Sequence, residues 1–323
     1  MLPELAARLR AALGVAHKRD IQSAARHFSH ARGGPWGSGE VRLGDDAAAI
    51  PDGEGHLLLA AEGMSPDLVA REPRFAGYCA VMVNASDIYA MGGRPLAIVD
   101  ALFAVNAEAA EPLLQGLADG AARFGVPIVG GHTNLHSPAP ALAAAVLGRA
   151  RRLLTSFDAR PGDNLIAAVD LRGHMHGQSF WNASTEGPDA RLRGDYALLP
   201  QLAEAGLSRA AKDISMGGLV GTALMMLEAS GLGATLVLDD VPRPAGVPWE
   251  HWLLAFPSYG FLLAVAPEAS ARVVETFRAR DIAAAVIGTA DESRRVRLRL
   301  DGAEVPWWDL SREPLTGFGP EAP

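Results

Sequence analysis

The first half of the chain alternates between short apolar runs and longer amphipathic segments. Apolar runs of strand length occupy residues 57–61, 96–103, 126–129 and 141–147, and helical spacing of apolar residues marks residues 2–13, 75–91 and 108–124. Because helices and strands alternate without a single βαβ repeat, the pattern predicts an α/β or α+β layer with helices packed on one face of a sheet.

A similar alternation starts again after residue 152. Strand-like runs occupy residues 165–169, 234–238, 261–265, 284–288 and 296–300, and helical spacing marks residues 196–205, 220–228 and 268–278. A length of 323 residues is enough for two domains with substantial cores. We therefore expect an N-terminal domain over residues 1–152 and a C-terminal domain over residues 153–323.

Composition narrows the class of protein. Hydrophobic residues make up 49% of the chain and charged residues 20%, which is typical of a globular protein. The net charge of −8 argues against a nucleic-acid partner. We expect neither a signal peptide nor a membrane span, because no apolar stretch reaches the ~20 residues that a bilayer needs. The single cysteine, Cys79, excludes an intramolecular disulfide and favours the cytoplasm.

Two adjacent acids carry the first candidate chemistry. Asp45 and Asp46 follow Gly44, and carboxylates on such a turn suit Mg²⁺. A glycine-rich loop upstream can bring backbone N–H groups close to phosphates; its glycines are Gly33, Gly34, Gly37 and Gly39. When the acidic pair is considered alone, an ordinary β-turn explains it better than a metal site does.

Polar residues also interrupt apolar segments elsewhere. Asn84 and Asp87 lie three positions apart, so they share one face of the predicted helix 75–91. Each could contact a neighbouring loop, or Asp87 could face a metal ion. Lys18 could reach a phosphate, but we expect a solvated surface charge there. Cys79 lies on the apolar face of the same helix and is expected in the core.

The order of the motifs resembles the aminoimidazole ribonucleotide (AIR) synthetase-like superfamily. In chain order they are Gly44-Asp45-Asp46-Ala47-Ala48, Val83-Asn84-Ala85-Ser86-Asp87-Ile88, Gly92-Gly93-Arg94-Pro95, Gly130-Gly131-His132-Thr133, Pro161-Gly162-Asp163 and Lys212-Asp213-Ile214-Ser215-Met216-Gly217-Gly218-Leu219. The superfamily includes AIR synthetase, formylglycinamidine ribonucleotide synthetase, thiamine monophosphate kinase and selenide water dikinase. This chain looks most similar to an AIR-synthase-related branch beside these named enzymes.

The resemblance implies a fold, a cofactor and a set of site residues. It implies an N-terminal mixed sheet with helices on one face, a barrel closed between the subunits of a homodimer, and a C-terminal α/β sandwich that completes a cleft for ATP and Mg²⁺. The implied metal ligands are Asp45, Asp46, Glu62, Asp87 and Asp213. The implied nucleotide contacts are Gly33, Gly34, Gly37, Gly39, Asn84, Asp213 and a predicted turn of Gly130, Gly131, His132 and Thr133.

Departures from the named relatives leave the substrate open. Met216 stands where the kinases have a second aspartate, and residues 33–39 lack the reactive cysteine of selenide water dikinases. Residues 257–260 lack the acids of the late thiamine monophosphate kinase motif. The sequence predicts an ATP- and Mg²⁺-dependent enzyme that phosphorylates or activates a small molecule, without indicating a catalytic base. The alternatives are ATP-driven amide activation with cyclisation or amination, and a nucleotide-binding regulator without turnover.

Overall fold

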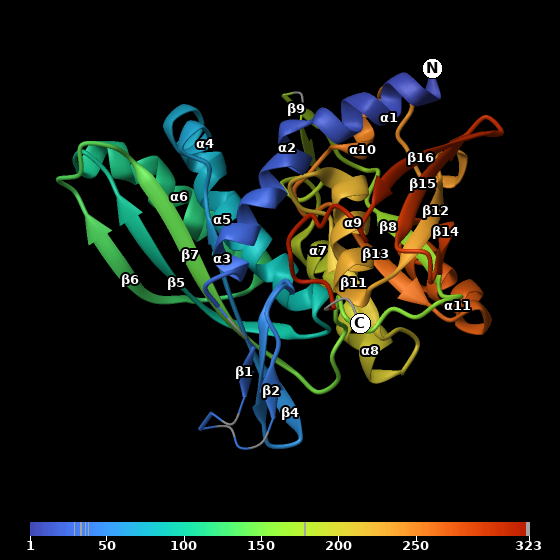
Figure 1. The fold of residues 1–323 in the computed structure, drawn as a ribbon. Coiled ribbons are helices and arrows are strands. Elements are labelled where there is room, and N and C mark those ends of the chain that lie inside the picture. Colours follow the sequence, from blue (N-terminus) through green and yellow to red (C-terminus); the bar gives the residue numbers. More distant parts are fainter. Residues whose placement is uncertain (29, 33, 36, 38, 178, 321–323) are drawn as a thin grey trace.

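A computed structural model describes residues 1–28, 30–32, 34–35, 37, 39–177 and 179–320. Figure 1 shows two sheet-containing halves: the larger sheet of the first half of the chain lies on the left and that of the second half on the right, while the N-terminal helix (blue) lies on the right beside the second sheet. Among the described residues, none of the helices combines the length and the apolar character needed to cross a membrane.

The N-terminal half is built on a five-stranded mixed sheet. Its strands, in spatial order, are β3 (Ala48–Asp52), β4 (Gly55–Gly63), β7 (Ala141–Ala150), β5 (Arg94–Phe103) and β6 (Ile128–Asn134). Only the β5–β6 pair among these neighbours is parallel. Helix α5 (Pro73–Ala90) packs on β4, β5 and β7, and helix α6 (Ala107–Phe124) packs on α5. The predicted mixed sheet with helices on one face is therefore confirmed.

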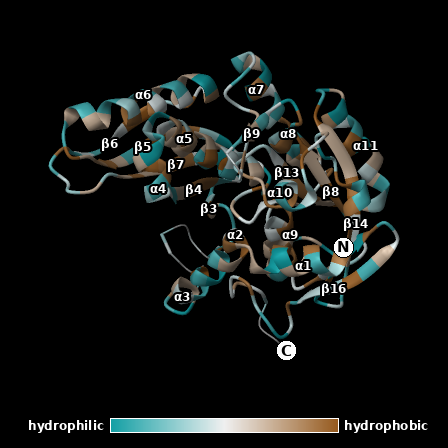
Figure 2. Cartoon of the chain, turned by 90° about the horizontal axis from the view of Figure 1, so that it is seen from above, coloured by the Kyte–Doolittle hydropathy of each residue, from teal (hydrophilic) through white to brown (hydrophobic). Residues whose placement is uncertain are grey.

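Small residues allow α5 and α6 to approach each other closely. A Cβ atom on Gly116 of α6 would overlap the backbone carbonyl oxygen of Arg74, and one on Gly77 of α5 would overlap that of Leu113. Figure 2 shows hydrophilic and hydrophobic residues alternating along α6, as expected of a helix with one buried face. Cys79 is buried in the same layer, which confirms its predicted core position. Burial, and then the charge of Glu72, raise the pKa of its thiol.

The opposite face of this sheet is open in the single chain. Leu59 on β4 is paired with Leu147 on β7, and both side chains are exposed. Val99 on β5 is exposed as well. The sheet is not closed into a barrel within the chain, since β3 and β6 form its two edges. The predicted barrel requires a second copy and stays a prediction.

The C-terminal half is built on a seven-stranded sheet. Its strands, in spatial order, are β11 (Ala210–Asp213), β13 (Gly260–Val265), β8 (Asn164–Val169), β14 (Ala283–Asp291), β12 (Gly233–Val237), β15 (Arg295–Leu300) and β16 (Ala303–Asp309). Successive residues of β8 face two different cores: Ile166 belongs to one and Leu165 to the other. Since both faces of the sheet are covered, the predicted α/β sandwich is confirmed.

Helices cover both faces of the C-terminal sheet. They are α7 (Asp189–Tyr196), α8 (Leu198–Glu204), α9 (Gly218–Ser230), α10 (Trp249–Leu253) and α11 (Pro267–Arg278). Helix α1 (Leu2–Ala11) packs on β16 and α10, and α2 (Leu13–Ala16) packs on α9. The start of the chain therefore lies against the C-terminal half in space. The domain boundary between residues 152 and 153 stays a prediction.

Short elements complete the described chain. They are the 3₁₀ helices η1 (His17–Asp20) and η2 (Leu238–Asp240), the helices α3 (Ile21–Ala25) and α4 (Pro66–Arg71), and the two-stranded pairs β1 (Ala31–Arg32) with β2 (Glu40–Val41) and β9 (His174–His176) with β10 (Phe180–Asn182).

Candidate active site

A cleft of about 580 Å³ lies between the two halves. The N-terminal half contributes the turn at Asp46, Glu62 at the end of β4 and Asp87 on α5. The C-terminal half contributes Lys212 and Asp213 at the end of β11. Residues far apart in sequence thus converge on one cavity, as the motif order predicts.

The turn before β3 is held by Asp45. Gly44 has a φ of 102°, a left-handed conformation that glycine adopts without strain. The Asp45 carboxylate accepts hydrogen bonds from the Ser156 backbone N–H at 2.8 Å and from the Ser156 hydroxyl at 2.6 Å. It also accepts one from the N–H of Asp46 at 3.0 Å. Burial raises the pKa of Asp45 to about 6 despite the opposing charge of Lys212. Asp45 therefore ties the turn to the segment that joins the two halves.

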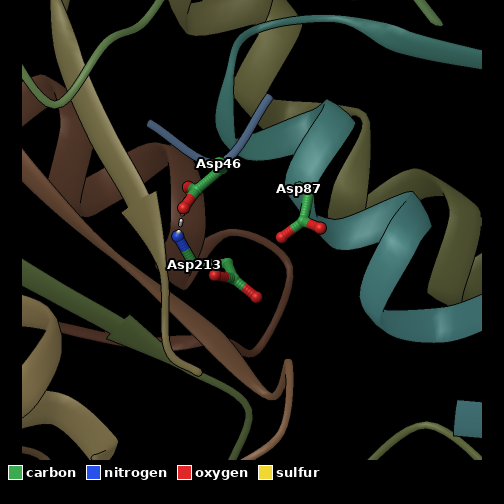
Figure 3. Close-up of side chains that lie close together, drawn as sticks. All are labelled: Asp46, Asp87 and Asp213. Carbon is green, nitrogen blue, oxygen red and sulfur yellow. Dashed lines mark hydrogen bonds between the residues drawn. The ribbon is translucent and has the colours of Figure 1, made fainter. Parts of the chain in front are cut away.

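Three of the five predicted metal ligands come together. One oxygen from each of Asp46, Asp87 and Asp213 lies within 4.8 Å of the others, and Figure 3 shows the three side chains around one space. Among the described residues, this group does not include the other two predicted ligands, Asp45 and Glu62. Glu62 lies on the cleft wall, where desolvation and the charge of Asp46 raise its pKa against the influence of Lys18 and Lys212.

Two buried carboxylate oxygens in this group have no hydrogen-bond partner among the described residues. They are Oδ2 of Asp87, a residue 5% exposed, and Oδ1 of Asp213, a residue 1% exposed. Burial, followed by the charge of Asp213, raises the pKa of Asp87. Burial, followed by the charge of Asp46, raises the pKa of Asp213 to about 7. Buried acids usually have partners, and a cation would supply one to both orphaned oxygens.

The oxygen-only donor set fits a hard divalent cation such as Mg²⁺. Carboxylates from three separate elements bring enough negative charge to bind such an ion and leave room for waters or phosphate oxygens. Burial first and the neighbouring like charges second make it costly to hold these acids together, and both raise the pKa of Asp87 and of Asp213.

Two lysines supply positive charge in the same cleft. Lys212 is buried and its ammonium forms an ion pair with Asp46. Burial acts to lower the pKa of Lys212, but the carboxylates of Asp46 and Asp45 outweigh it and raise the value. The sequence motifs predict no role for Lys212. The available signal was a lysine between two alanines and Asp213.

Lys18 is the second of these lysines, and the expectation of a solvated surface charge was wrong. It lines the cleft from η1, and its ammonium donates to the Ser215 hydroxyl at 3.3 Å. Burial, together with the nearby charge of Lys212, lowers its pKa. The packing of α2 against α9 brings Lys18 here, and this long-range contact has no local sequence signal.

Asn84 lies inside the helix layer. Its side chain is buried, and Nδ2 donates to the carbonyl of Ala80 at 2.8 Å, one turn earlier in α5. Its Oδ1 has no partner among the described residues. Asn84 is one turn away from Asp87 but is not among the described residues that line the cleft. Its contact with nucleotide stays a prediction.

The expected turn at Gly130, Gly131, His132 and Thr133 was wrong. These residues belong to β6, which pairs in parallel with β5 and remains extended as far as Asn134. Two glycines permit a turn but do not require one, and pairing along β5 keeps this backbone straight. In Figure 1, β6 is the outermost strand of the sheet, and the described cleft lining does not include it. The His132 ring packs 5.6 Å from that of Phe103.

The glycine-rich loop lies between β1 and β2. Gly33 falls outside the described residues. Gly34, Gly37 and Gly39 are described, but they are not among the described residues that line the cleft. A Cβ atom on Gly39 would come within 2.6 Å of the Pro51 side chain, so this glycine allows close packing on β3. Phosphate binding by the loop stays a prediction.

The polar segment over residues 172–188 lies beside a different cavity from the one that the three aspartates line. His176 Nε2 is 2.5 Å from the Glu72 carboxylate, and its ring packs 4.7 Å from that of Phe75. Thr185 and Glu72 line this second cavity of about 700 Å³. The described part of the segment therefore reaches the start of α5 and not the three aspartates.

Comparison with known proteins identifies the class. Residues 44–150 match the N-terminal domain of the AIR synthase related protein family, and residues 160–301 match its C-terminal domain. The chain is 49% identical over 321 residues to the uncharacterized protein sll0787 of Synechocystis sp., with 98% of this chain and 99% of that protein covered. The chain therefore belongs to the AIR synthase related family.

Named enzymes are more distant relatives. The chain is 30% identical over 253 residues to the phosphoribosylformylglycinamidine synthase subunit PurL of Thermotoga maritima, covering 71% of this chain and 41% of PurL. The structure of T. maritima PurL complexed with ATP matches with a TM-score of 0.72 and 23% identity, over 95% of this chain and 51% of that chain. AaThiL complexed with AMPPCP and TMP matches with a TM-score of 0.63 and 20% identity, over 82% of this chain and 91% of that chain. Both structures share the fold.

Proposed function

We propose that this protein is an ATP- and Mg²⁺-dependent enzyme that phosphorylates or activates a small molecule, in the manner of thiamine monophosphate kinase. The observation that carries this proposal is the convergence of Asp46, Asp87 and Asp213 around two orphaned carboxylate oxygens. The cleft of about 580 Å³ has the size of a small-molecule site. The ATP bound to PurL and the AMPPCP and TMP bound to AaThiL support a nucleotide as one ligand.

The residues of the cleft suit phosphoryl transfer, which depends on positioning and charge stabilisation. Bound Mg²⁺ would neutralise negative charge on the phosphates of ATP. Asp46, Asp87 and Asp213 would hold the ion, and Asp45 keeps the turn that carries Asp46 in place through Ser156. Lys18 and Lys212 add positive charge where phosphate oxygens would lie.

The test combines binding with product analysis. Isothermal titration of the wild-type chain with AMPPNP is expected to show binding that requires Mg²⁺. Incubation with ATP and a panel of small metabolites is then expected to give ADP and a phosphorylated product, detected by mass spectrometry. The absence of Mg²⁺-dependent AMPPNP binding would refute the proposal.

The relationship to PurL favours ATP-driven amide activation as a second candidate. Both reactions begin with transfer of the γ-phosphoryl group to a substrate oxygen, so the same acids and lysines serve both. A cyclised or aminated product with release of inorganic phosphate would identify this second reaction. Binding without ADP release across the panel would identify a regulator without turnover.

We also propose a homodimer formed through the open face of the N-terminal sheet. Exposed apolar side chains on neighbouring strands, including Leu59, Val99 and Leu147, are costly to leave in water and typical of an interface. Light scattering after size exclusion is expected to give twice the chain mass for the wild type and the single-chain mass for Val99→Glu.

Leu114→Glu provides the matched control for this prediction. Leu114 on α6 is 41% exposed and Val99 is 43% exposed, but Leu114 lies in the helix layer. This variant is expected to remain dimeric. A wild-type protein with the mass of one chain would show that the proposed dimer is wrong.

A further inference from the structure

The last described part of the chain forms one wall of the cleft. Thr316 and Phe318 line the same cavity as Asp46 and Asp87. In Figure 1 this C-terminal segment, residues 313–320 (red), runs from β16 back to the middle of the molecule beside α9. None of the sequence motifs includes these residues, so their place in the cleft is a finding of the structure.

A buried carboxylate anchors the segment. Glu228 is 4% exposed and lies in α9, where most of its neighbours are apolar. It accepts hydrogen bonds from the backbone N–H groups of Leu315 at 2.8 Å and Thr316 at 2.7 Å. The Thr316 hydroxyl at 2.6 Å and the N–H of Gly317 at 3.2 Å complete the set. A buried charge with four donors from one short segment is a specific attachment, since an unpaired charge there would be costly.

Further contacts hold both ends of the segment. Gln22 of α3 donates to the carbonyls of Pro314 at 2.9 Å and Leu315 at 3.0 Å. The carboxylate of Glu313 pairs with Arg10 and Arg19. Arg294 donates to the carbonyl of Pro320 at 3.2 Å. The segment is therefore fixed along its length by groups from several elements.

This anchoring places Phe318 directly on the turn that carries Asp46, one of the three grouped aspartates. A Cβ atom added to Gly44 would overlap the Cβ and ring carbons of Phe318. Asp45 and Asp46 are the next two residues of the chain. Ser156 fixes the turn through Asp45, and Phe318 packs against the turn at Gly44. The turn that carries Asp46 is thus supported from two sides.

We propose that Phe318 is a positioning residue for Asp46 and that the C-terminal segment, anchored by Glu228, is a permanent wall of the nucleotide cleft. The contact between Phe318 and Gly44 is seen directly in the structure. The effect of this contact on nucleotide binding rests on the proposed function. Two experiments separate these parts.

The first experiment is a double-mutant cycle that needs no ligand. Gly44→Ala adds a methyl group that collides with Phe318 and strains a left-handed backbone. In the wild-type background it combines both penalties, whereas in Phe318→Gly, which removes the Cβ atom as well as the ring, only the backbone strain remains. Thermal denaturation is expected to show a loss of Tm from Gly44→Ala that is smaller by at least ~3 °C in the Phe318→Gly background. Equal losses in the two backgrounds would overturn the proposal.

The second experiment measures Mg²⁺-dependent AMPPNP affinity by titration calorimetry. Phe318→Ala is expected to weaken binding by about tenfold, and Phe318→Leu, which keeps an apolar side chain against Gly44, by less than about threefold. Leu114→Ala on α6 is the control and is expected to bind as the wild type does.

The two readouts distinguish the possible failures. Lower Tm with unchanged affinity in Phe318→Ala would reduce the segment to a structural role and overturn the positioning proposal. A wild-type chain that does not bind AMPPNP would refute the proposed function instead, and the stability cycle would then decide whether Phe318 holds the turn.

Discussion

Replacing Asp213 with asparagine is expected to remove nucleotide binding while leaving the fold at least as stable as in the wild type. Asparagine has the shape of aspartate, but it lacks the negative charge that a bound Mg²⁺ needs. AMPPNP affinity in the presence of Mg²⁺ is expected to fall by about 100-fold or more, which is ~2.8 kcal/mol at 1.4 kcal/mol per decade.

The same substitution is expected to raise folding stability although it weakens binding, because the Asp213 carboxylate destabilises the folded protein when no ion is bound. It lies beside Asp46 and Asp87, and its pKa is raised to about 7 by burial and then by the charge of Asp46. An unfolded aspartate has a pKa of about 3.9, so the folded wild type holds an extra proton between about pH 4 and 7. Wild-type stability without metal should therefore fall as pH rises through this window.

Asp213→Asn does not carry this penalty, so its advantage in Tm without metal should grow from about pH 4 to 7 and remain above it. Denaturation curves with EDTA at several pH values measure the stability, and calorimetry measures the binding. Asp119→Asn, at an exposed acid on α6, is the control for both measurements. A stabilised variant that still binds AMPPNP with wild-type affinity would contradict the assignment of Asp213 to the metal site.

The sequence predicted those helices and strands whose apolar residues match the face that is buried in the structure. Residues 75–91 have helical spacing, and the structure has α5 at Pro73–Ala90. The helices and the two sheets follow from such patterns because burial of an apolar face determines both the pattern and the packing. The family resemblance implied five metal ligands, and the structure brings three of them, Asp46, Asp87 and Asp213, together.

Long-range packing explains what the sequence did not reveal. Nothing near Lys18 indicates that α2 packs on α9 and turns this lysine into the cleft. Asp45 and Asp46 have the same chemistry and adjacent positions, but the Asp45 carboxylate accepts hydrogen bonds from Ser156, and only Asp46 of the two joins Asp87 and Asp213. Phe318 reaches Gly44 only because Glu228, on a separate helix, holds the end of the chain. Such assignments depend on the tertiary structure.

Gly130 to Thr133 illustrates the opposite case, in which local chemistry was misleading. Paired glycines before a polar residue are typical of a turn. Here the parallel partner β5 continues alongside, and the backbone forms more hydrogen bonds by staying extended. Because β6 lies at the edge of the sheet, a second copy of the chain could contact these residues.

Lys212→Met is expected to be the most destabilising single change in the cleft. The substitution keeps an unbranched apolar stem but removes the charge that pairs with Asp46. Asp46 and Asp45 would then share a buried site without their nearest cation. Removal of one partner from a buried ion pair costs about 3–5 kcal/mol, so Tm without metal should fall by about 6–15 °C.

Lys18→Met is the matched control, because the two lysines share the cleft but differ in surroundings. The pKa of Lys18 is lowered by burial and then by Lys212, so the protein already disfavours its charge. Its hydrogen bond to Ser215 is long, at 3.3 Å. Replacement of Lys18 should lower the free energy of unfolding by less than about 1 kcal/mol.

Addition of Mg²⁺ should recover much of the stability lost in Lys212→Met, because a cation bound by Asp46, Asp87 and Asp213 restores the missing positive charge. Equal losses in the two variants, or no recovery with Mg²⁺, would show that Lys212 does not balance the charge of this acidic site.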